Sequence, residues 1–216
     1  MNLKGGRPEQ FGAIASFFYR LWAEPALSPM HDRIAAEIPL EYGRILDVGC
    51  GPGRLTRRIG AARPNTQITG LDLSADMIRQ AERGPRLPNL VFRQGRPATL
   101  EGRGAFDFAL SVLSFHHWEE PADDLAAIHR ILAPGGRLWI YEQDPEADGA
   151  AIHADRARMW LGLRVPIAWQ RRLARGHGFT MREIETNVRP LAERVWARFE
   201  VRRSGSCLRL ELQKVE

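Results

Sequence analysis

A glycine-rich turn after a short apolar segment is the first feature of the sequence that could do chemistry. Asp47 precedes three glycines at alternate positions, Gly49, Gly51 and Gly53. Glycine accepts positive φ and lets a ligand approach the backbone closely. A carboxylate ahead of such a turn repels a pyrophosphate and attracts a ligand that carries an ammonium or a sulfonium group. The turn therefore favours a positively charged nucleoside, and S-adenosylmethionine carries both groups.

A second carboxylate follows at a spacing that suits a nucleoside. Asp72 comes 21 residues after Gly51, at the end of the next apolar segment. An acidic side chain at this position can accept hydrogen bonds from both ribose hydroxyls and repels a 2′-phosphate. Leu73 and Met77 could contact the adenine. The alternative is that Asp72 caps the helix that begins near Ser74, and the two roles are compatible.

The acceptor side of the reaction has fewer clear candidates. His116 or His117 could act as a general base, because histidine titrates near neutral pH. Glu142 is a further candidate base. The alternative is that the His116–His117 loop is structural and transfers no proton. A metal held by His116, His117 and Glu119 is not expected, because adjacent histidines diverge on an extended loop; we predict no metal site.

Alternating strands and helices position these residues. Helical or strand patterning and turn residues mark each segment. Strands are predicted at residues 44–48, 67–73, 90–93, 106–113 and 137–142, and helices at 55–62, 75–83 and 121–132. Such βα units favour a parallel, doubly wound sheet. The pattern predicts that the carboxyl ends of the strands hold the ligand.

The two ends of the chain do not show the alternation of strands and helices. Residues 1–43 look helical and are predicted to form a cap, with a second short helix at about 29–37; Phe11, Phe18, Tyr19, Trp22 and His31 are candidate pocket residues. Residues 150–175 look helical with a break near Pro166. Residues 181–186 are predicted as a strand, and Ser204-Gly205 as the turn of a terminal hairpin. The predicted domains are thus a helical cap at 1–43 and a ligand-binding domain at 44–216.

Several motifs in one order resemble class I S-adenosylmethionine-dependent methyltransferases, and among them the ubiquinone/menaquinone-biosynthesis subgroup. The motifs are Leu46-Asp47-Val48-Gly49-Cys50-Gly51-Pro52-Gly53, Gly70-Leu71-Asp72-Leu73-Ser74, Ser114-Phe115-His116-His117-Trp118 and Arg130-Ile131-Leu132-Ala133-Pro134-Gly135-Gly136. The resemblance implies an α/β, three-layer αβα Rossmann-like fold with a seven-stranded, mostly parallel sheet, an antiparallel last strand and N-terminal helices. Gly178-Phe179 resembles the entry to the sixth strand.

The resemblance also implies roles for individual residues. Asp47, Gly49, Cys50 and Gly51 would hold the methionine part of S-adenosyl-L-methionine. Asp72 would bind the ribose, with Leu73 and Met77 beside the adenine, and Ser111 and Val112 would lie near the methionine end. The family commonly has Gly-Asp after the third strand, where this chain has Gly95-Arg96. Arginine has no acceptor, so backbone groups read the adenine, Arg96 stacks on it, or adenine recognition is weaker.

Composition and charge narrow the class of protein. The 216 residues include two cysteines, so neither a disulfide framework nor a four-cysteine zinc site is expected. With no apolar N-terminal segment and no membrane-spanning run visible, we expect a cytoplasmic protein. Residues 151–216 hold 14 basic and 7 acidic side chains, a bias that suits an anionic substrate, RNA or simply a solvated surface.

Three functions remain open at this point. The leading one is methyl transfer to an O, N or C atom of a small-molecule acceptor. An RNA or protein methyltransferase is the second, motivated by the basic C-terminal third. The third is a non-catalytic module that binds S-adenosylmethionine, motivated by Arg96 and the lack of an obvious base. The sequence does not determine the oligomeric state.

Overall fold

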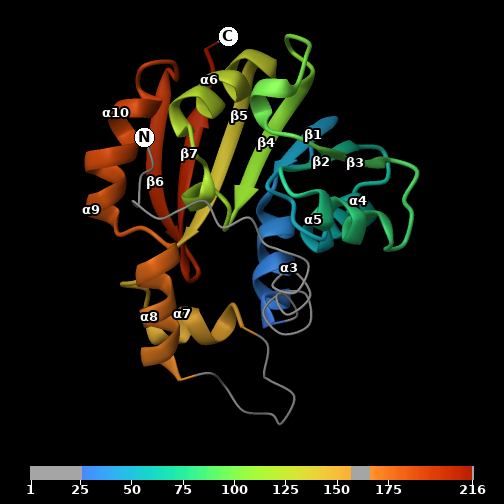
Figure 1. The fold of residues 1–216 in the computed structure, drawn as a ribbon. Coiled ribbons are helices and arrows are strands. Elements are labelled where there is room, and N and C mark those ends of the chain that lie inside the picture. Colours follow the sequence, from blue (N-terminus) through green and yellow to red (C-terminus); the bar gives the residue numbers. More distant parts are fainter. Residues whose placement is uncertain (1–25, 157–165, 216) are drawn as a thin grey trace.

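One seven-stranded sheet organises the chain in a computed structural model that describes residues 26–156 and 166–215 (Figure 1). The strand order is β3-β2-β1-β4-β5-β7-β6. The strands are β1 (Arg44–Val48), β2 (Gln67–Asp72), β3 (Leu90–Gln94), β4 (Phe106–Val112), β5 (Leu132–Gln143), β6 (Arg198–Ser204) and β7 (Cys207–Gln213). Strands β1 to β5 pair in parallel, and β7 is antiparallel to both β5 and β6. The predicted mostly parallel sheet and terminal hairpin are confirmed.

Helices follow the strands as the pattern predicts. They are α3 (Ser28–Glu37), α4 (Arg54–Ala62), α5 (Ala75–Glu82), α6 (Pro121–Ile131), α7 (Gly149–Ala154), α8 (Ile167–His177), α9 (Met181–Glu183) and α10 (Arg189–Ala192), with short turns η2 (Pro97–Thr99), η3 (Phe115–His117) and η4 (Ile184–Val188). Ser74 caps α5, since its hydroxyl accepts the amide of Met77 at 3.4 Å. Pro121 occupies the first turn of α6, where a missing N–H is harmless.

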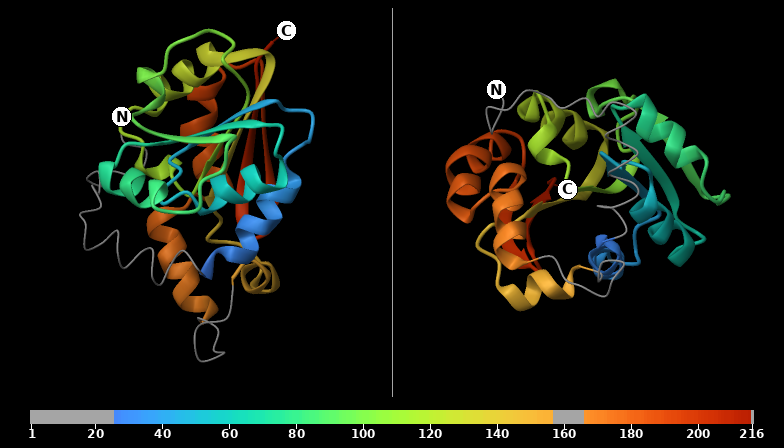
Figure 2. Two further views of the ribbon diagram at one scale, coloured as in Figure 1. Left: turned by 90° about the vertical axis from the view of Figure 1, so that its right-hand side faces the viewer. Right: turned by 60° about the horizontal axis from the view of Figure 1, so that its bottom comes forward.

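Two apolar cores lie on opposite faces of the sheet, which makes the three-layer αβα arrangement. On one face, Leu46, Ala109 and Ile140 pack with α6 and the η4–α10 segment. On the other face, Phe108 and Tyr141 pack with α3 and α4. Alternation along the strands produces this division, because successive side chains point to opposite faces. Figure 2 shows the helical layers on both sides.

The predicted strand at residues 181–186 is wrong. This segment begins α9 and continues into a π-helical turn, and the sixth strand starts only at Arg198. Thr180 and Glu183 form a capping box, in which the Glu183 amide reaches the Thr180 hydroxyl at 3.2 Å and the Thr180 amide reaches the Glu183 carboxylate at 2.7 Å. Ile184 and Val188 then bury themselves four residues apart, a helical spacing. Gly178-Phe179 therefore leads into a helix rather than into a strand.

Helix α3 packs on the sheet face that carries Phe108 and Tyr141, and it lies beside α7 (Figures 1 and 2). Arg33 joins the two by donating to Asp155 with Nε at 2.8 Å and Nη2 at 2.9 Å. Glu37 accepts from the hydroxyl of Tyr141 at 2.9 Å and from Arg209 at 3.0 Å. These contacts tie α3 to β5 and β7. The helix predicted near residues 11–22 lies outside the described residues, so Phe11, Phe18, Tyr19 and Trp22 are not placed.

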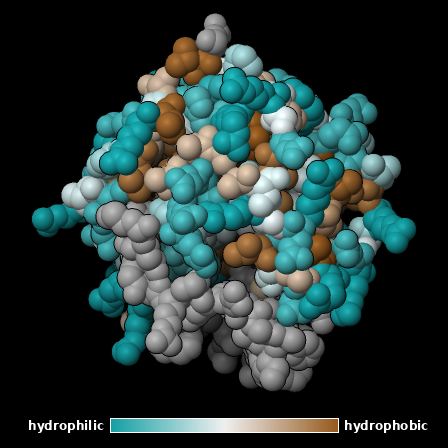
Figure 3. Space-filling model, turned by 45° about the horizontal axis from the view of Figure 1, so that its top comes forward, coloured by the Kyte–Doolittle hydropathy of each residue, from teal (hydrophilic) through white to brown (hydrophobic). Residues whose placement is uncertain are grey.

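The surface in Figure 3 is predominantly hydrophilic, with hydrophobic residues in separate small areas. The large apolar side chains that are exposed come from different elements: Leu40, Leu73, Val91, Val195 and Val215. Within the described residues, no helix is both long and apolar enough to cross a membrane.

Candidate active site

The turn between β1 and α4 is held against β2 by its own backbone. The amides of Gly49 and Cys50 donate to the carbonyl of Leu71 at 2.7 and 3.0 Å. Gly49 has φ +73°, and a Cβ on it would lie 1.8 Å from the hydroxyl oxygen of Ser114. Only glycine fits there. Gly51 also has positive φ, +54°, but a Cβ on it meets no described atom within 4 Å, so the turn has one packed and one open side.

Asp47 lies beneath this turn and is 2% exposed. Its carboxylate accepts the Thr56 hydroxyl at 2.7 Å. Burial raises the pKa of Asp47 to about 7, although the Thr56 hydrogen bond opposes the rise. The carboxyl is thus poised to ionise near neutral pH. A cation that binds beside it favours the ionised form.

Asp72 joins the turn to the end of β2. One carboxylate oxygen accepts the Gly51 amide at 2.9 Å, and the other accepts the Ser74 amide at 2.9 Å. Burial raises the pKa of Asp72, and these two hydrogen bonds oppose the rise. Ser74, not Asp72, is the cap of α5. Each carboxylate oxygen keeps a second lone pair that can accept a ligand hydroxyl.

The residues expected beside the adenine differ in exposure. Leu73 is 58% exposed, whereas Met77 is buried at 6%. The Gly95 amide donates to the Asp72 carbonyl at 2.9 Å. Arg96 is paired with α6: Nε and Nη2 donate to Asp124 at 3.2 and 3.1 Å, and Nη1 donates to Glu120 at 2.8 Å. The guanidinium is thus committed to two carboxylates, which weakens the alternative that it stacks on the adenine.

Cys50 and Ser111 are both buried near the turn. A Cβ on Gly70 would lie 3.1 Å from the Cys50 sulfur, which places this thiol against β2, and burial raises its pKa. Ser111 is the penultimate residue of β4 and is 0% exposed, and its hydroxyl has no hydrogen-bond partner among the described residues. A buried polar atom without a partner calls for a ligand or an ordered water. Val112 is half-buried, and Leu113 follows at φ +52°, a strained value for leucine.

The structure brings His116 and Glu142 together. His116 Nδ1 lies 2.8 Å from Glu142 Oε2, and the His116 amide donates to Oε1 at 3.1 Å. Glu142 is 0% exposed, so it is not an exposed base; both its oxygens are occupied by His116. A carboxylate in this position fixes the orientation of the imidazole and stabilises it when it is protonated.

His117 lies against two other histidines. Its ring centroid is 4.0 Å from that of His116 and 6.4 Å from that of His177. Burial, together with the neighbouring His116 and His177, lowers the pKa of His117 to about 4. The expectation that adjacent rings diverge is wrong, because residues 115–117 form a 3-10 turn instead of an extended loop. Glu119 does not join this cluster.

Three further residues near these strands have other surroundings. Trp118 is buried in the core, where its ring lies edge-on to that of Phe115 with the ring centroids 5.0 Å apart. Tyr141 points to the opposite face of the sheet and bonds Glu37. His31 is buried against α4, with Nδ1 3.3 Å from Arg58 Nη1, and burial lowers its pKa to about 4. Sequence reasoning missed His177 and Thr56.

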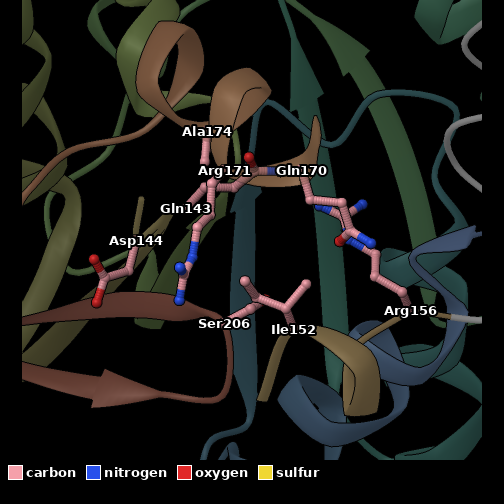
Figure 4. A pocket seen from close by; sticks show the side chains of 8 residues that line it. All are labelled: Gln143, Asp144, Ile152, Arg156, Gln170, Arg171, Ala174 and Ser206. Atoms are coloured by element: carbon pink, nitrogen blue, oxygen red, sulfur yellow. The ribbon is translucent and has the colours of Figure 1, made fainter. Parts of the chain in front are cut away.

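A small polar pocket opens at the end of β5, between α7 and α8 (Figure 4). Arg156 and Gln170 extend toward each other on one side of it. On the other side Arg171 donates to the Ala147 carbonyl at 2.9 Å. The lining residues are Gln143, Asp144, Ile152, Arg156, Gln170, Arg171, Ala174 and Ser206. Two of the lining residues, Gln143 and Asp144, come directly after Glu142 in the sequence.

The part of the chain that contains the turn between β1 and α4 is similar to known proteins. Residues 46–138 match the family model described as "Methyltransferase domain". These residues are similar to a methyltransferase domain. The resemblance drawn from the motifs is confirmed, and the matched residues include Asp47, Asp72 and the His116–His117 turn.

Curated relatives of the methyltransferase domain carry the same kind of name. Over 131 residues the chain is 37% identical to trans-aconitate 2-methyltransferase of Methylobacterium nodulans, covering 58% of this chain and 48% of the relative. Over 152 residues it is 30% identical to ubiquinone biosynthesis O-methyltransferase of Xanthomonas oryzae pv. oryzae, covering 64% and 61%. The alignments therefore span about half to three fifths of these relatives.

A solved structure supports the fold over almost the whole chain. A candidate S-adenosyl-L-methionine-dependent methyltransferase from Methanococcus maripaludis superposes with a TM-score of 0.76 at 19% identity. The superposition covers 98% of this chain and 97% of the other. At this identity the likeness speaks for the fold alone.

Proposed function

We propose that the protein is an S-adenosylmethionine-dependent methyltransferase that acts on a small, polar acceptor. The observation that carries this proposal is the arrangement of Asp47, the open side of Gly51 and Asp72 at the ends of β1 and β2. Two carboxylates bracket a bare backbone turn there, and both have raised pKa values. Such an arrangement suits a cationic nucleoside and opposes a phosphorylated one.

The residues present fit this cofactor. The open space at Gly51 leaves room for a ligand close to the backbone. The partnerless Ser111 hydroxyl offers a donor and an acceptor at the end of β4. We infer that Asp47 attracts the ammonium group, that Asp72 accepts from the ribose hydroxyls, and that Gly49, Cys50, Ser111 and Val112 border the methionine part. Leu73 and the Gly95–Arg96 backbone border the adenine, with Met77 beneath it.

His116 is the residue we assign to proton transfer. The bound cofactor supplies a methyl group on a sulfonium, which is a good leaving group. Acceptors that must lose a proton need a base, and His116 is held in place by Glu142. Glu142 acts through His116, because it is buried and both its oxygens are engaged by that residue. His117 lies close enough to share this role.

The pocket of Figure 4 is polar, but its space suffices for about one water molecule, so the pocket by itself does not indicate the acceptor. One relative is named for trans-aconitate, the anion of an organic acid, and another for O-methylation. We therefore place an oxygen atom of a small acidic or hydroxylated molecule first among acceptors.

RNA is the less supported acceptor. The basic C-terminal third suggested it, but many of these arginines are paired with acids. Arg198 and Arg202 bond Glu200 at 2.5 and 2.6 Å, and Arg203 bonds Asp144 at 2.9 Å. Arg209 bonds Glu211 at 2.7 Å. Neutralised arginines contribute little to binding a phosphate backbone.

The division into a cap at 1–43 and a domain at 44–216 remains a proposal. The part of the cap that the structure describes shares a core with the strands, because Met30 and Ile34 pack with Ile45 and Phe108. We also retain the cytoplasm as the proposed location. The two thiols, Cys50 and Cys207, are free and buried, as a reducing compartment allows.

Transfer of a labelled methyl group tests the proposed function. The protein is incubated with methyl-labelled S-adenosylmethionine and either a small-molecule extract, total RNA or total protein. We expect label in a small molecule and none with the Asp72→Ala variant. Label found only in RNA or only in protein would show that the acceptor belongs to that class and not to the small molecules. Tight cofactor binding without transfer in any fraction would favour the non-catalytic module.

A further inference from the structure

We propose that His116, His117 and His177 form a binding site for one divalent transition-metal ion of the zinc class. No catalytic role assigned above requires His177, and the site goes beyond the proposed function. The three histidines come from two elements, η3 and the end of α8. One nitrogen from each ring lies within 4.8 Å of the others.

The rings converge on one region. The centroid of His116 is 4.0 Å from that of His117 and 5.6 Å from that of His177. Two imidazole nitrogens on a tetrahedral zinc ion are separated by about 3.4 Å, given Zn–N bonds of about 2.05 Å. The rings therefore need to move by roughly an ångström, a motion that exposed His177 can make by rotating its side chain.

Glu142 holds the ring of His116 through the nitrogen that would not bind the metal. Histidines that bind metals commonly donate their other ring N–H to a carboxylate, which fixes the tautomer and raises the basicity of the ligand. His116 Nδ1 lies 2.8 Å from buried Glu142 Oε2. If Nδ1 donates to Glu142, Nε2 is left as the acceptor of a metal ion. Among the described residues, Glu142 has no arginine or lysine partner, and this role explains why a carboxylate is buried there.

The backbone after α8 fixes the position of His177. The Phe179 amide donates to the Gln143 carbonyl at 3.0 Å. A Cβ on Gly178 would lie 2.1 Å from that same carbonyl oxygen, so only glycine allows this approach. His177 is thus attached to the strand that carries Glu142. It also lies in the last turn of α8, where the helix dipole favours a cation.

The ligand types select the metal. Three imidazoles without a carboxylate among them suit zinc, cobalt, nickel or copper and do not suit magnesium or calcium. Three protein ligands leave a fourth position open, as in catalytic zinc sites. His116 is mostly buried and His177 is exposed, so an ion can enter from solvent.

The open position lies near the cofactor turn. Ser114, two residues before His116, is in contact range of Gly49. An acceptor oxygen bound to the metal would be polarised there, and its hydroxyl would lose a proton more easily. This role of the metal rests on the proposed function, whereas the metal site itself does not. With the ion bound, Nε2 of His116 would be a ligand, so polarisation of the acceptor by the metal would take the place of proton transfer to His116.

Metal binding is tested without cofactor or acceptor. Tag-free protein is stripped with a chelator and dialysed, and then titrated with Zn²⁺ by calorimetry and with Co²⁺ by visible absorption. We expect one ion per chain and a Co²⁺ spectrum typical of nitrogen and oxygen ligands. His177→Gln should weaken zinc binding at least about tenfold, and Glu142→Gln by about 10- to 100-fold.

The matched control is His153→Gln, which changes a histidine on α7 that is outside the cluster. It should bind zinc as the wild type does. Circular dichroism verifies that each variant is folded, and exposed His177 makes that variant the least disruptive. Absence of zinc binding by the wild type, or equal affinity of the wild type and the folded His177→Gln protein, would overturn the site. A sulfur-to-cobalt charge-transfer band would assign the ion to a cysteine and would overturn it as well.

Discussion

Asp47 and Asp72 lie at the carboxyl ends of neighbouring strands, and their environments give them different tasks. Asp47 is buried under the turn and accepts one hydrogen bond, from Thr56. Asp72 accepts two backbone amides, one of them from the turn itself. We therefore infer that the first carboxylate supplies charge to a bound cation, and that the second supplies both loop geometry and hydrogen-bond acceptors.

The raised pKa of Asp47 predicts pH-dependent cofactor binding. A carboxyl with a pKa of about 7 is half ionised at pH 7 and mostly protonated at pH 6. The ammonium group pairs with the ionised form, so affinity for S-adenosylmethionine should fall about fivefold from pH 7 to pH 6. Calorimetry at the two pH values measures it. Asp47→Asn should bind weakly at both, and a wild-type affinity that is equal at both pH values contradicts the role.

Asp72→Ala should weaken S-adenosylmethionine binding by about 1.5–3 kcal/mol, because charged hydrogen bonds to the ribose are lost. Asp76→Ala is the matched control, since Asp76 lies on α5 and pairs with Arg79. Calorimetry compares both variants with the wild type. Unchanged affinity in the Asp72 variant would remove this residue from the site.

At the scale of single residues, local spacing predicted which residues meet at the turn after β1 but not which residues meet around His116. Asp47, Gly51 and Asp72 are brought together by the strand ends that the pattern implied. His177 could not be found this way, because 60 residues separate it from His117 and their approach depends on how α8 returns to β5. The burial of Glu142 is likewise a consequence of tertiary packing.

The packing of the turn between β1 and α4 predicts that glycine-to-alanine substitutions at its two positions will have different effects. Gly51→Ala places a methyl group in the open space and costs about 1–2 kcal/mol of backbone strain. Gly49→Ala adds a clash with Ser114. Denaturation should show the larger loss for Gly49→Ala, and calorimetry should show that folded Gly51→Ala binds S-adenosylmethionine weakly.

The Ser114→Gly substitution should restore part of the stability that Gly49→Ala removes, because it deletes the clashing atoms. Equal stability of the two single variants would contradict the packing described at this turn.

The link between α3 and the sheet predicts a stability effect far from the turn. Glu37 accepts from Tyr141, Ser204 and Arg209 and pairs with Arg33. Glu37→Gln should lower the free energy of unfolding by about 1.5–3 kcal/mol. Exposed Glu41→Gln is the control, and it should change stability little.

The contacts of Glu37 also determine the pH range in which this residue stabilises the fold. Burial raises the pKa of Glu37, but hydrogen bonds from Arg33 and Tyr141 outweigh it, and the pKa is lowered overall. The stability it contributes is therefore present above its unfolded pKa of about 4.3 and is lost as the pH falls through its folded value. Denaturation at pH 7 and at pH 3 should show the Glu37→Gln difference shrinking, and a difference that grows in acid contradicts the account.

At the scale of elements, periodicity predicted the βα units and failed after α8. Residues 181–186 were predicted as a strand, yet the Thr180–Glu183 capping box starts a helix there. The T-x-x-E signal was present in the sequence and is typical of a helix start. Ile184 and Val188, four residues apart, are then buried on one face of this helical segment.

The whole molecule combines a net charge of +5 with a surface on which many arginines are paired. Its fold aligns over 98% of its length with a solved structure, while its curated relatives align over about half to three fifths of theirs. The likeness to the solved structure thus supports the order of the strands and the position of their carboxyl ends. The family model does not cover the residues outside 46–138, which include the lining of the pocket at the end of β5.

Cofactor selectivity tests the central claim most directly. Wild-type protein is titrated at pH 7.5 with S-adenosylmethionine and, separately, with NAD⁺, and heat and melting temperature are recorded. The account predicts one S-adenosylmethionine bound per chain, a melting temperature that rises with ligand concentration, and no response to NAD⁺. Binding of NAD⁺ with no response to S-adenosylmethionine would contradict it.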